Sequence, residues 1–349
     1  MTTCLVTGGA GFIGCAVSGR LADRFDTVVA FDNLHPQVHA TAERPAALDD
    51  RVELVRGDVT EADDWRAMLA TVRPVTVLHL AAETGTAQSL TESSRHASVN
   101  VLGTTRMLDA FVEHDIRPDR IVLTSSRAVY GEGAWRSADG QLHYPGQRTH
   151  AMLTSGEWDF PGLTPQPAHA AYTQTRPTSV YGATKLAQEH LVSAWCLAMG
   201  VAPVILRLQN VYGAGQSPTN PYTGIVVLFA QLARAGKAIP VYEDGSIVRD
   251  FVHVDDVAAA LELAVALDGP ALVDVGSGVP TTVAELAARV ARAYAAPEPR
   301  VTGQYREGDV RYACVAPGAG EALGWAPSVG LDEGLAGLFE WLGQRSDAR

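Results

Sequence analysis

The sequence predicts an α/β protein with a doubly wound parallel sheet, followed by a smaller α/β region. Short apolar runs alternate with helical patterns through the first half of the chain, which is typical of a parallel sheet between helices. These runs are continuous stretches of Val, Leu and Ile, as expected for strands covered on both faces. After Tyr212 proline and glycine interrupt the rhythm. We therefore expect a sheet domain over residues 1–211 and a smaller region over residues 212–349.

The individual elements follow from the same patterns. Expected strands are Cys4–Thr7, Thr27–Phe31, Val52–Val55, Val75–Leu80, Arg120–Thr124, Ala202–Leu208 and the later Ile239–Tyr242. Expected helices include Ser98–His114, Gly182–Met199, Thr223–Ala235, Val254–Leu267, Thr282–Ala295 and Leu331–Leu342. The segment from Glu132 to Thr178 is rich in Gly, Pro, His, Thr and Gln and lacks sustained periodicity. Because long loops inside compact domains often act as lids, we expect a lid there, with an inert surface insertion as the alternative.

Composition excludes several classes of protein. The 349 residues are 47% hydrophobic, enough to bury a large core. A formal net charge of −12 argues against a protein that binds nucleic acid. Scattered Cys4, Cys15, Cys196 and Cys314 show no spacing for zinc or disulfides, so we expect a reducing cytoplasm and no metal site. Apolar runs are too short to span a bilayer, so no membrane insertion is expected.

A glycine-rich turn follows the first strand. Gly8, Gly11 and Gly14 stand in the order that lets a backbone turn tightly, approach a pyrophosphate and pack a helix on a strand. Asp32 ends the second strand, where a carboxylate accepts hydrogen bonds from an adenosine ribose. The context predicts a Rossmann-type dinucleotide site. Asp32 favours NAD because it repels the extra phosphate of NADP, although His35 or a distant arginine could accommodate that phosphate.

Tyr181 and Lys185 lie four residues apart in a predicted helix and therefore project from the same face. An ammonium group beneath a phenol favours the ionised phenol, so this pair is suited to proton transfer. Tyrosine and lysine at this spacing also occur on ordinary solvated helices. The other motifs of the sequence are needed to distinguish a catalytic pair from an ordinary solvated helix.

Together these motifs resemble the NAD-dependent epimerase/dehydratase family of extended short-chain dehydrogenases/reductases. The matching segments are Thr7–Gly14, Gly57–Val59, His79–Ala82, Ser125–Ser126 before Val129–Gly131, Tyr181–Lys185, Arg207–Gly213, Val248–Asp256 and Tyr305–Asp309. The resemblance implies that Ser126 hydrogen-bonds the reacting oxygen, Tyr181 moves its proton, and Lys185 holds the nicotinamide ribose while lowering the pKa of Tyr181.

The same resemblance implies the contacts of cofactor and substrate. Cofactor-binding positions are Gly8, Gly11, Phe12, Ile13, Gly14, Asp32, Asn33, Asp58, Val59, Leu80, Ala81, Ala82, Asn100, Tyr181 and Lys185. Positions for a nucleotide-diphosphate sugar are Arg127, Asn210, Asn220, Val241, Arg249, Arg306 and Asp309. Arginine forks suit phosphate oxygens, with a surface salt bridge as the alternative for each, and for Asn100 a structural role is the alternative. Residues 212–349 are accordingly expected to bind mainly the substrate.

Residues after Ser126 narrow the reaction. Related dehydratases carry an acidic pair there, whereas this chain has Arg127 and Ala128, so a dehydratase is disfavoured. The long insertion and the segments Asp32–His39 and Asn220–Gly224 resemble enzymes of dTDP-6-deoxyhexoses. We expect hydride transfer at C4, narrowly favouring a 4-ketoreductase, which would use NADPH, over an L-rhamnose-type 4-epimerase that retains NAD. The alternative outside the enzymes is a catalytically silent scaffold that binds a dinucleotide with the same fold. The helices 98–114 and 182–199 are expected to pair in a homodimer.

Overall fold

A seven-stranded parallel sheet forms the centre of the molecule. The structure is a computed structural model that describes residues 1–218 and 224–347. Its strands follow the order β13-β9-β5-β4-β1-β2-β3, and all neighbours run parallel. They are β1 (Thr3–Thr7), β2 (Thr27–Asp32), β3 (Val52–Arg56), β4 (Thr76–His79), β5 (Arg120–Ser126), β9 (Ala202–Leu208) and β13 (Ala271–Val275). This confirms the predicted doubly wound sheet, with its strands close to the expected apolar runs.

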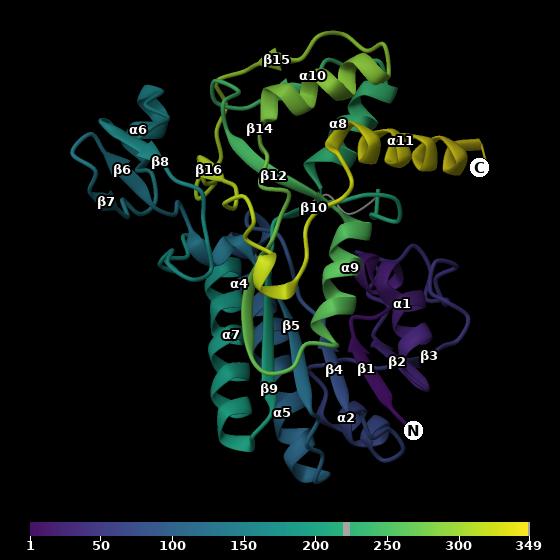
Figure 1. Cartoon of the computed structure of the whole chain (residues 1–349). Helices are drawn as coiled ribbons and strands as arrows, with labels where there is room; N and C mark the ends of the chain where they lie inside the picture. The colour runs from purple at the N-terminus through teal and green to yellow at the C-terminus, as the bar shows by residue number, and fades with distance from the viewer. Residues whose placement is uncertain (219–223, 348–349) are drawn as a thin grey trace.

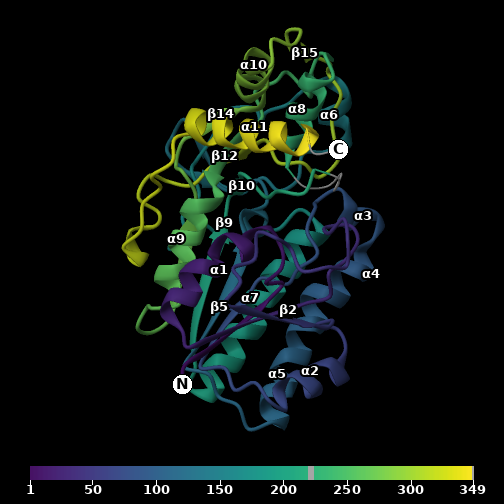
Figure 2. The same cartoon turned by 90° about the vertical axis from the view of Figure 1, so that its right-hand side faces the viewer.

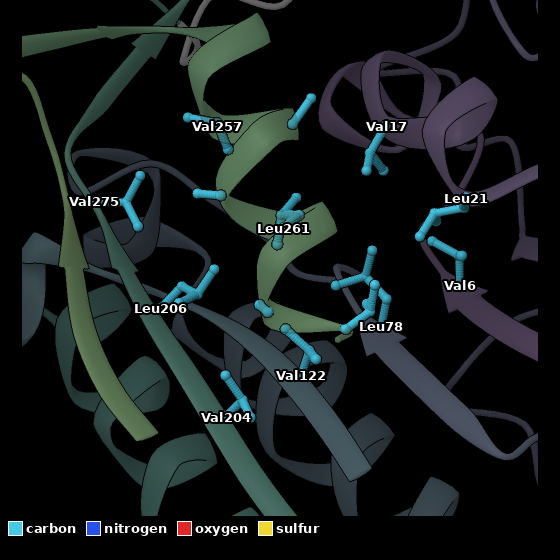
Figure 3. Close-up of a cluster of buried hydrophobic side chains, with 14 of the residues drawn as sticks. Val6, Val17, Leu21, Leu78, Val122, Val204, Leu206, Val257, Leu261 and Val275 are labelled. Atoms are coloured by element: carbon cyan, nitrogen blue, oxygen red, sulfur yellow. The ribbon is translucent and has the colours of Figure 1, made fainter. Parts of the chain in front are cut away.

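Helices cover both faces of this sheet (Figures 1 and 2). One face carries α1 (Phe12–Arg24) and α9 (Val254–Ala264), and the other carries α2 (Ala62–Leu69), α5 (Gly103–Glu113) and α7 (Val180–Met199). Because side chains alternate along a strand, Val6 joins the core with Leu261, shown in Figure 3, whereas Leu5 joins the core with Phe111. Within the described part of the chain, no helix has both the length and the apolarity needed to cross a bilayer.

The segment after residue 211 contributes to two bodies of structure. Strand β13 pairs with β9 and α9 packs on α1, so part of this segment completes the central sheet. The rest forms a lobe beyond the carboxyl ends of the strands (Figure 1). Its elements are β10 (Asn210–Tyr212), α8 (Ile225–Arg234), β11 (Pro240–Val241), β12 (Val248–His253), β14 (Pro280–Thr282), α10 (Val283–Ala293), β15 (Arg300–Val301), β16 (Tyr312–Ala313) and α11 (Leu331–Asp347). The short 3-10 helix η3 (Glu321–Leu323) packs instead on the sheet domain, where Leu323 joins the core of α1 and α9. Substrate binding by this lobe stays a prediction.

The insertion at residues 132–178 has secondary structure that the sequence pattern did not reveal. Strands β6 (Trp135–Ser137), β7 (Leu142–His143) and β8 (Leu163–Pro165) form a small antiparallel sheet, and α6 (His150–Ser155) lies between β7 and β8 in the chain. Strands of two or three residues are too short to show a period. A role as a lid stays a prediction.

The predicted helix 98–114 is less regular than expected. In the structure α3 (Gln88–Thr91) and α4 (Ser93–His96) lead into a π-helical segment, η1 (Ala97–Leu102), before α5 begins. Asn100 lies in that π-helical segment and is fully buried. Wide turns of this kind depend on tertiary partners and frequently mark functional sites, so local sequence does not predict them.

Candidate active site

The glycine-rich turn between β1 and α1 lies close against the residues that follow β4. Gly8 has φ of +67°, and a Cβ atom there would lie 2.7 Å from the backbone nitrogen of Ala81. Gly14 lies in the first turn of α1, where a Cβ would collide with the carbonyl oxygen of Gly9. The first position needs glycine for its left-handed backbone and the close approach, and the second needs it for packing.

Asp32 fixes this turn from the end of β2. Its side chain is 8% exposed and accepts hydrogen bonds from the backbone N–H groups of Ala10, at 3.0 Å, and Leu34, at 2.8 Å. The neighbouring Asn33 donates to Asp58 at 2.9 Å. Although burial opposes it, hydrogen bonds from Thr60 and Asn33 lower the pKa of Asp58. Carboxylate oxygens accept more than one hydrogen bond each, so lone pairs remain on Asp32 for the predicted ribose contact and on Asp58 for the predicted contact with an adenine edge.

A pocket of about 170 Å³ opens beside these groups. Its lining brings together the predicted cofactor residues Gly8, Gly11, Asp32, Asn33, Asp58, Val59, Leu80, Ala81 and Ala82. Among the described residues that line it, Arg95 is the single arginine, and it pairs with Glu83 at 2.7 Å and Glu92 at 3.0 Å. The turn, the N-terminus of α1 and Asp32 thus fit a dinucleotide cofactor, and the one arginine of the described lining is already paired with carboxylates.

Ser126 and Tyr181 come together at the carboxyl end of the sheet. Ser126 ends β5, and its hydroxyl accepts a hydrogen bond from the backbone N–H of Ala128 at 3.2 Å, in the short 3-10 helix η2 (Arg127–Tyr130). The hydroxyl of Ser126 lies near the phenol of Tyr181 and opposes the rise in its pKa that burial causes. A Cβ at Gly182 would collide with the carbonyl oxygen of Ala128, so η2 and the start of α7 are in direct contact.

The electrostatics of Tyr181 differ from the sequence expectation. Burial raises the pKa of Tyr181, and the groups that oppose this rise are Ser126 and Arg127. Lys185, expected to lower that pKa, instead donates a hydrogen bond to Gln188 at 2.6 Å. Burial lowers the pKa of Lys185 itself to about 7, opposed by Glu189. The correction has a simple cause: spacing along a helix places two side chains on one face, but burial and nearer partners decide their protonation.

Asn100 supports the first turn of α7. Its amide donates to the hydroxyl of Thr184 at 2.9 Å and to the Glu83 carbonyl at 3.0 Å, and its oxygen accepts from the Glu83 N–H at 2.8 Å. Thr184 in turn donates to the carbonyl oxygen of Tyr181 at 2.8 Å. These bonds describe a supporting role, and the predicted cofactor contact of Asn100 stays a prediction.

Four predicted substrate residues lie around the start of η2 and strand β12. Arg127 donates to Asn210 at 2.9 Å, and Arg249, which is 5% exposed, donates to Asp309 at 2.5 Å. Burial and the charge of Arg249 lower the pKa of Arg127 to about 10. Two guanidinium groups therefore repel each other in one partly buried region, an arrangement that an anionic ligand would relieve.

Other predicted residues are placed differently. Arg306 is exposed and lies over the ring of Tyr242, 5.1 Å from its centroid. The side chain of Val241 is 1% exposed and belongs to the core of the lobe, and its predicted contact with the substrate stays a prediction. Asn220 lies outside the described residues, as does the expected helix start at Thr223.

Sequence reasoning missed a buried ion pair directly behind Ser126. Glu189 forms a two-pronged pair with Arg207, at 2.9 and 2.7 Å, and accepts from Ser125 at 2.5 Å. Arg207 also donates to the hydroxyl of Tyr130 at 3.0 Å. This ties the end of β5, η2, α7 and β9 together. Arginine in a strand predicted to be buried on both faces is the signal that could have revealed it.

Comparison with known proteins agrees with this geometry. Residues 4–276 match the NAD dependent epimerase/dehydratase family. The chain is 57% identical over 348 residues to a dTDP-L-rhamnose 4-epimerase of Burkholderia thailandensis, covering 99% of this chain and 96% of that protein. It is 32% identical over 348 residues to a UDP-glucose 4-epimerase of Mycolicibacterium smegmatis, covering 98% and 99%.

A solved structure shows the same architecture. The UDP-glucose 4-epimerase of Thermus thermophilus, in complex with NAD, is 29% identical and superposes with a TM-score of 0.78, covering 98% of this chain and 99% of that one. Most of the chain therefore matches in sequence and in fold, and the glycine turn and Asp32 lie together beside one pocket. This chain belongs to the NAD dependent epimerase/dehydratase family.

Proposed function

We propose that this chain is an NAD-dependent 4-epimerase that interconverts a dTDP-6-deoxyhexose of the L-rhamnose type and its C4 epimer. The observation that carries this proposal is the 57% identity, over 99% of the chain, to the Burkholderia thailandensis 4-epimerase. The sequence alone narrowly favoured a ketoreductase. Ketoreductase and epimerase share the same serine, tyrosine and lysine, so those residues cannot distinguish the two enzymes. The identity to a known 4-epimerase favours the epimerase.

The catalytic residues are suited to this reaction. Inversion at C4 requires the C4 hydroxyl to lose a proton and the C4 carbon to lose a hydride. After the keto sugar has rotated in the site, the hydride must return to the opposite face of C4 and the proton to its oxygen. NAD, when bound, accepts that hydride and gives it back. We assign the proton to Tyr181: its phenolate form, which burial disfavours and which Ser126 and Arg127 favour, takes the proton from the C4 hydroxyl, and the resulting phenol returns it to the keto oxygen. Ser126 donates a hydrogen bond to the same oxygen. Because Ser126 acts on the phenol of Tyr181 at short range, the two hydroxyls are placed to meet one substrate oxygen.

Arg127 argues against dehydration. Loss of water needs an acid that protonates the departing hydroxyl. Arg127 stands where related dehydratases carry an acidic residue, and a guanidinium cation donates hydrogen bonds in place of the carboxylic acid that such enzymes supply. Together with Asn210, Arg249 and Asp309 it instead offers N–H groups and oxygens suited to a sugar diphosphate. Arg306 and Tyr242, at the rim of the lobe, are proposed to meet the nucleotide.

A homodimer is proposed from exposed apolar side chains on the helical layer of α5 and α7. Leu102, Val112 and Leu197 are 42%, 57% and 85% exposed. Contiguous exposed apolar patches often mark a protein interface, and the proposed dimer contact is a patch that includes these side chains. A monomer mass in light scattering at micromolar protein would contradict the dimer.

The decisive experiment supplies purified protein with dTDP-L-rhamnose and no added nicotinamide cofactor or reductant. We expect a second dTDP-6-deoxyhexose to appear and approach an equilibrium ratio, with inverted configuration at C4 by NMR. In a parallel reaction the protein receives a dTDP-4-keto-6-deoxyhexose and NADH or NADPH. One-to-one oxidation of that cofactor, without any epimerisation in the first reaction, would establish the ketoreductase and overturn the proposal.

A further inference from the structure

Lys185 has an inward-facing partner one helical turn further along α7. Its ammonium group donates to the side-chain oxygen of Gln188 at 2.6 Å. Lys185 is 2% exposed and Gln188 is fully buried, so solvent does not compete for this bond. A lysine that holds a cofactor ribose therefore has one of its three N–H groups committed to a glutamine that the sequence analysis did not identify.

The other end of Gln188 is held by Thr104 on α5. The glutamine amide donates to the Thr104 hydroxyl at 2.8 Å, and that hydroxyl donates its hydrogen to the carbonyl oxygen of Asn100 at 2.6 Å. Since a hydroxyl has one hydrogen, Thr104 accepts from Gln188. This direction forces the glutamine oxygen to point toward Lys185. The orientation of the amide is thus decided by the network around it.

His79 on β4 completes the network and remains neutral. One ring nitrogen lies 2.9 Å from the Thr104 hydroxyl, and the other lies 2.6 Å from the hydroxyl of Thr7, directly before Gly8 in the cofactor turn. Burial, together with the charge of Lys185, lowers the pKa of His79 to about 3. The described bonds therefore link the cofactor turn to Lys185 through uncharged groups.

Titratable groups lie near Lys185 on its own helix and on the neighbouring strand. Tyr181 and Glu189 share its helix, and His79 faces it from β4. Glu189 is held by Arg207 and Ser125. Gln188 is consequently a direct partner that is neutral, in a place where a glutamate of nearly the same shape would bring a countercharge.

We propose that Gln188 is a positioning residue for Lys185: its amide oxygen, oriented by Thr104, holds the ammonium group in place without adding a negative charge. The catalytic consequence rests on the proposed function, because it assumes that Lys185 serves the cofactor, but the contact itself does not. A neutral acceptor in a buried site is consistent with the lowered pKa of Lys185, about 7. A carboxylate in the same place would favour the charged ammonium and raise that pKa.

The test measures the titration of Lys185 directly, without substrate. The chain has two lysines, Lys185 and the exposed Lys237, so protein labelled with carbon-13 at lysine Cε gives two assignable NMR signals, with Lys237→Arg identifying each. In the unsubstituted protein we expect the Lys185 signal to titrate with a midpoint near pH 7. In Gln188→Glu the Lys185 midpoint should rise by about one pH unit or more. In Gln188→Leu it should fall, because the charged form loses an acceptor.

Paired variants separate positioning from a general effect of packing. Thr104→Val should lower the Lys185 midpoint, because the amide loses the hydroxyl that orients it, and Thr104→Ser should restore it. Gln141→Glu, on the exposed insertion, is the matched control and should leave both lysines unchanged. Thermal unfolding verifies that each variant is folded.

Two outcomes would overturn the proposal: an unchanged Lys185 midpoint in Gln188→Glu, or an unchanged midpoint in Thr104→Val. Neither depends on the sugar that the enzyme uses. If dTDP-L-rhamnose proved not to be a substrate while these shifts appeared, the proposed function would fail and the positioning role would stand.

Discussion

Two buried polar clusters of this chain, one around Lys185 and one around Arg148, lie at similar depth but have opposite composition. Lys185 and Arg148 are each 2% exposed. The described hydrogen bond of Lys185 goes to a neutral glutamine. Arg148 instead lies between two carboxylates, 3.2 Å from Glu132 and 2.9 Å from Glu243. The Lys185 cluster therefore gives its cation a neutral hydrogen-bond partner, whereas the Arg148 cluster pairs its cation with carboxylates.

The difference teaches what each cluster does. The Arg148 cluster joins the insertion to the lobe, because Arg311 also contacts Glu243 at 3.0 Å and Asp159 at 2.8 Å. Removing one member of a buried ion pair leaves an unpaired charge, which costs more than removing a neutral hydrogen bond. We therefore expect substitutions near Arg148 to change stability, and substitutions near Tyr181 and Lys185 to change rate and titration.

The largest expected effect is on the rate. Tyr181→Phe should lower the epimerisation rate about 10²- to 10⁴-fold, because the proton-transfer group is lost. Its midpoint of thermal unfolding should change little, since one hydroxyl is removed. The matched control is Tyr172→Phe, at a side chain that is 65% exposed, which should retain full activity. A Tyr181→Phe protein that keeps the full epimerisation rate would refute the assignment of proton transfer to Tyr181.

Arg148→Leu should show the reverse behaviour. We expect a loss of about 3–5 kcal/mol in the free energy of unfolding, because Glu132 remains buried without its ion-pair partner, whereas Glu243 retains Arg311. Urea titration followed by circular dichroism measures it. Arg136→Leu, in the same insertion but exposed, should cost much less. Equal losses of unfolding free energy in both variants would show that the Arg148 cluster does not stabilise the contact between the insertion and the lobe.

Gly8→Ala separates backbone strain from crowding on the cofactor side. Gly8 and Gly140 both have positive φ, +67° and +86°, but a Cβ would meet Ala81 at the first and nothing within 4 Å at the second. Gly140→Ala therefore reports strain alone, about 1 kcal/mol, and Gly8→Ala should cost more. Calorimetric titration with NAD should show weaker binding in Gly8→Ala and unchanged binding in Gly140→Ala. Equal NAD affinity in the two variants would refute a close approach of cofactor to this turn.

The smallest expected effect is a pH dependence of stability on the Arg148 side. Burial raises the pKa of Glu132 from 4.5 to about 7, although Arg148 opposes it. The folded chain thus retains a proton that the unfolded chain releases, so this contribution to stability is complete below pH 4.5 and is lost as pH rises through about 7. Glu132→Gln should flatten this decline between about pH 5 and pH 8 in urea unfolding. An unchanged slope would assign the pH dependence to other groups.

Local sequence patterns predicted the parts of the fold that depend on neighbouring residues. The sheet strands and the glycine turn were confirmed, because apolar runs, strand ends and glycine positions depend on residues that are adjacent in the sequence. The return of β13 to β9 was not predicted, because the two strands are far apart in sequence. The short strands of the insertion were missed because they contain too few residues to show a period.

The sequence by itself determined the fold class and the chemical identity of the candidate reacting groups, since glycine, serine, tyrosine and lysine carry their chemistry wherever they are placed. The tertiary structure decided their environment. It showed that burial raises the pKa of Tyr181, that Ser126 and Arg127 oppose this, and that Lys185 faces Gln188. These properties depend on desolvation and on partners from other elements, which no spacing along one helix can specify.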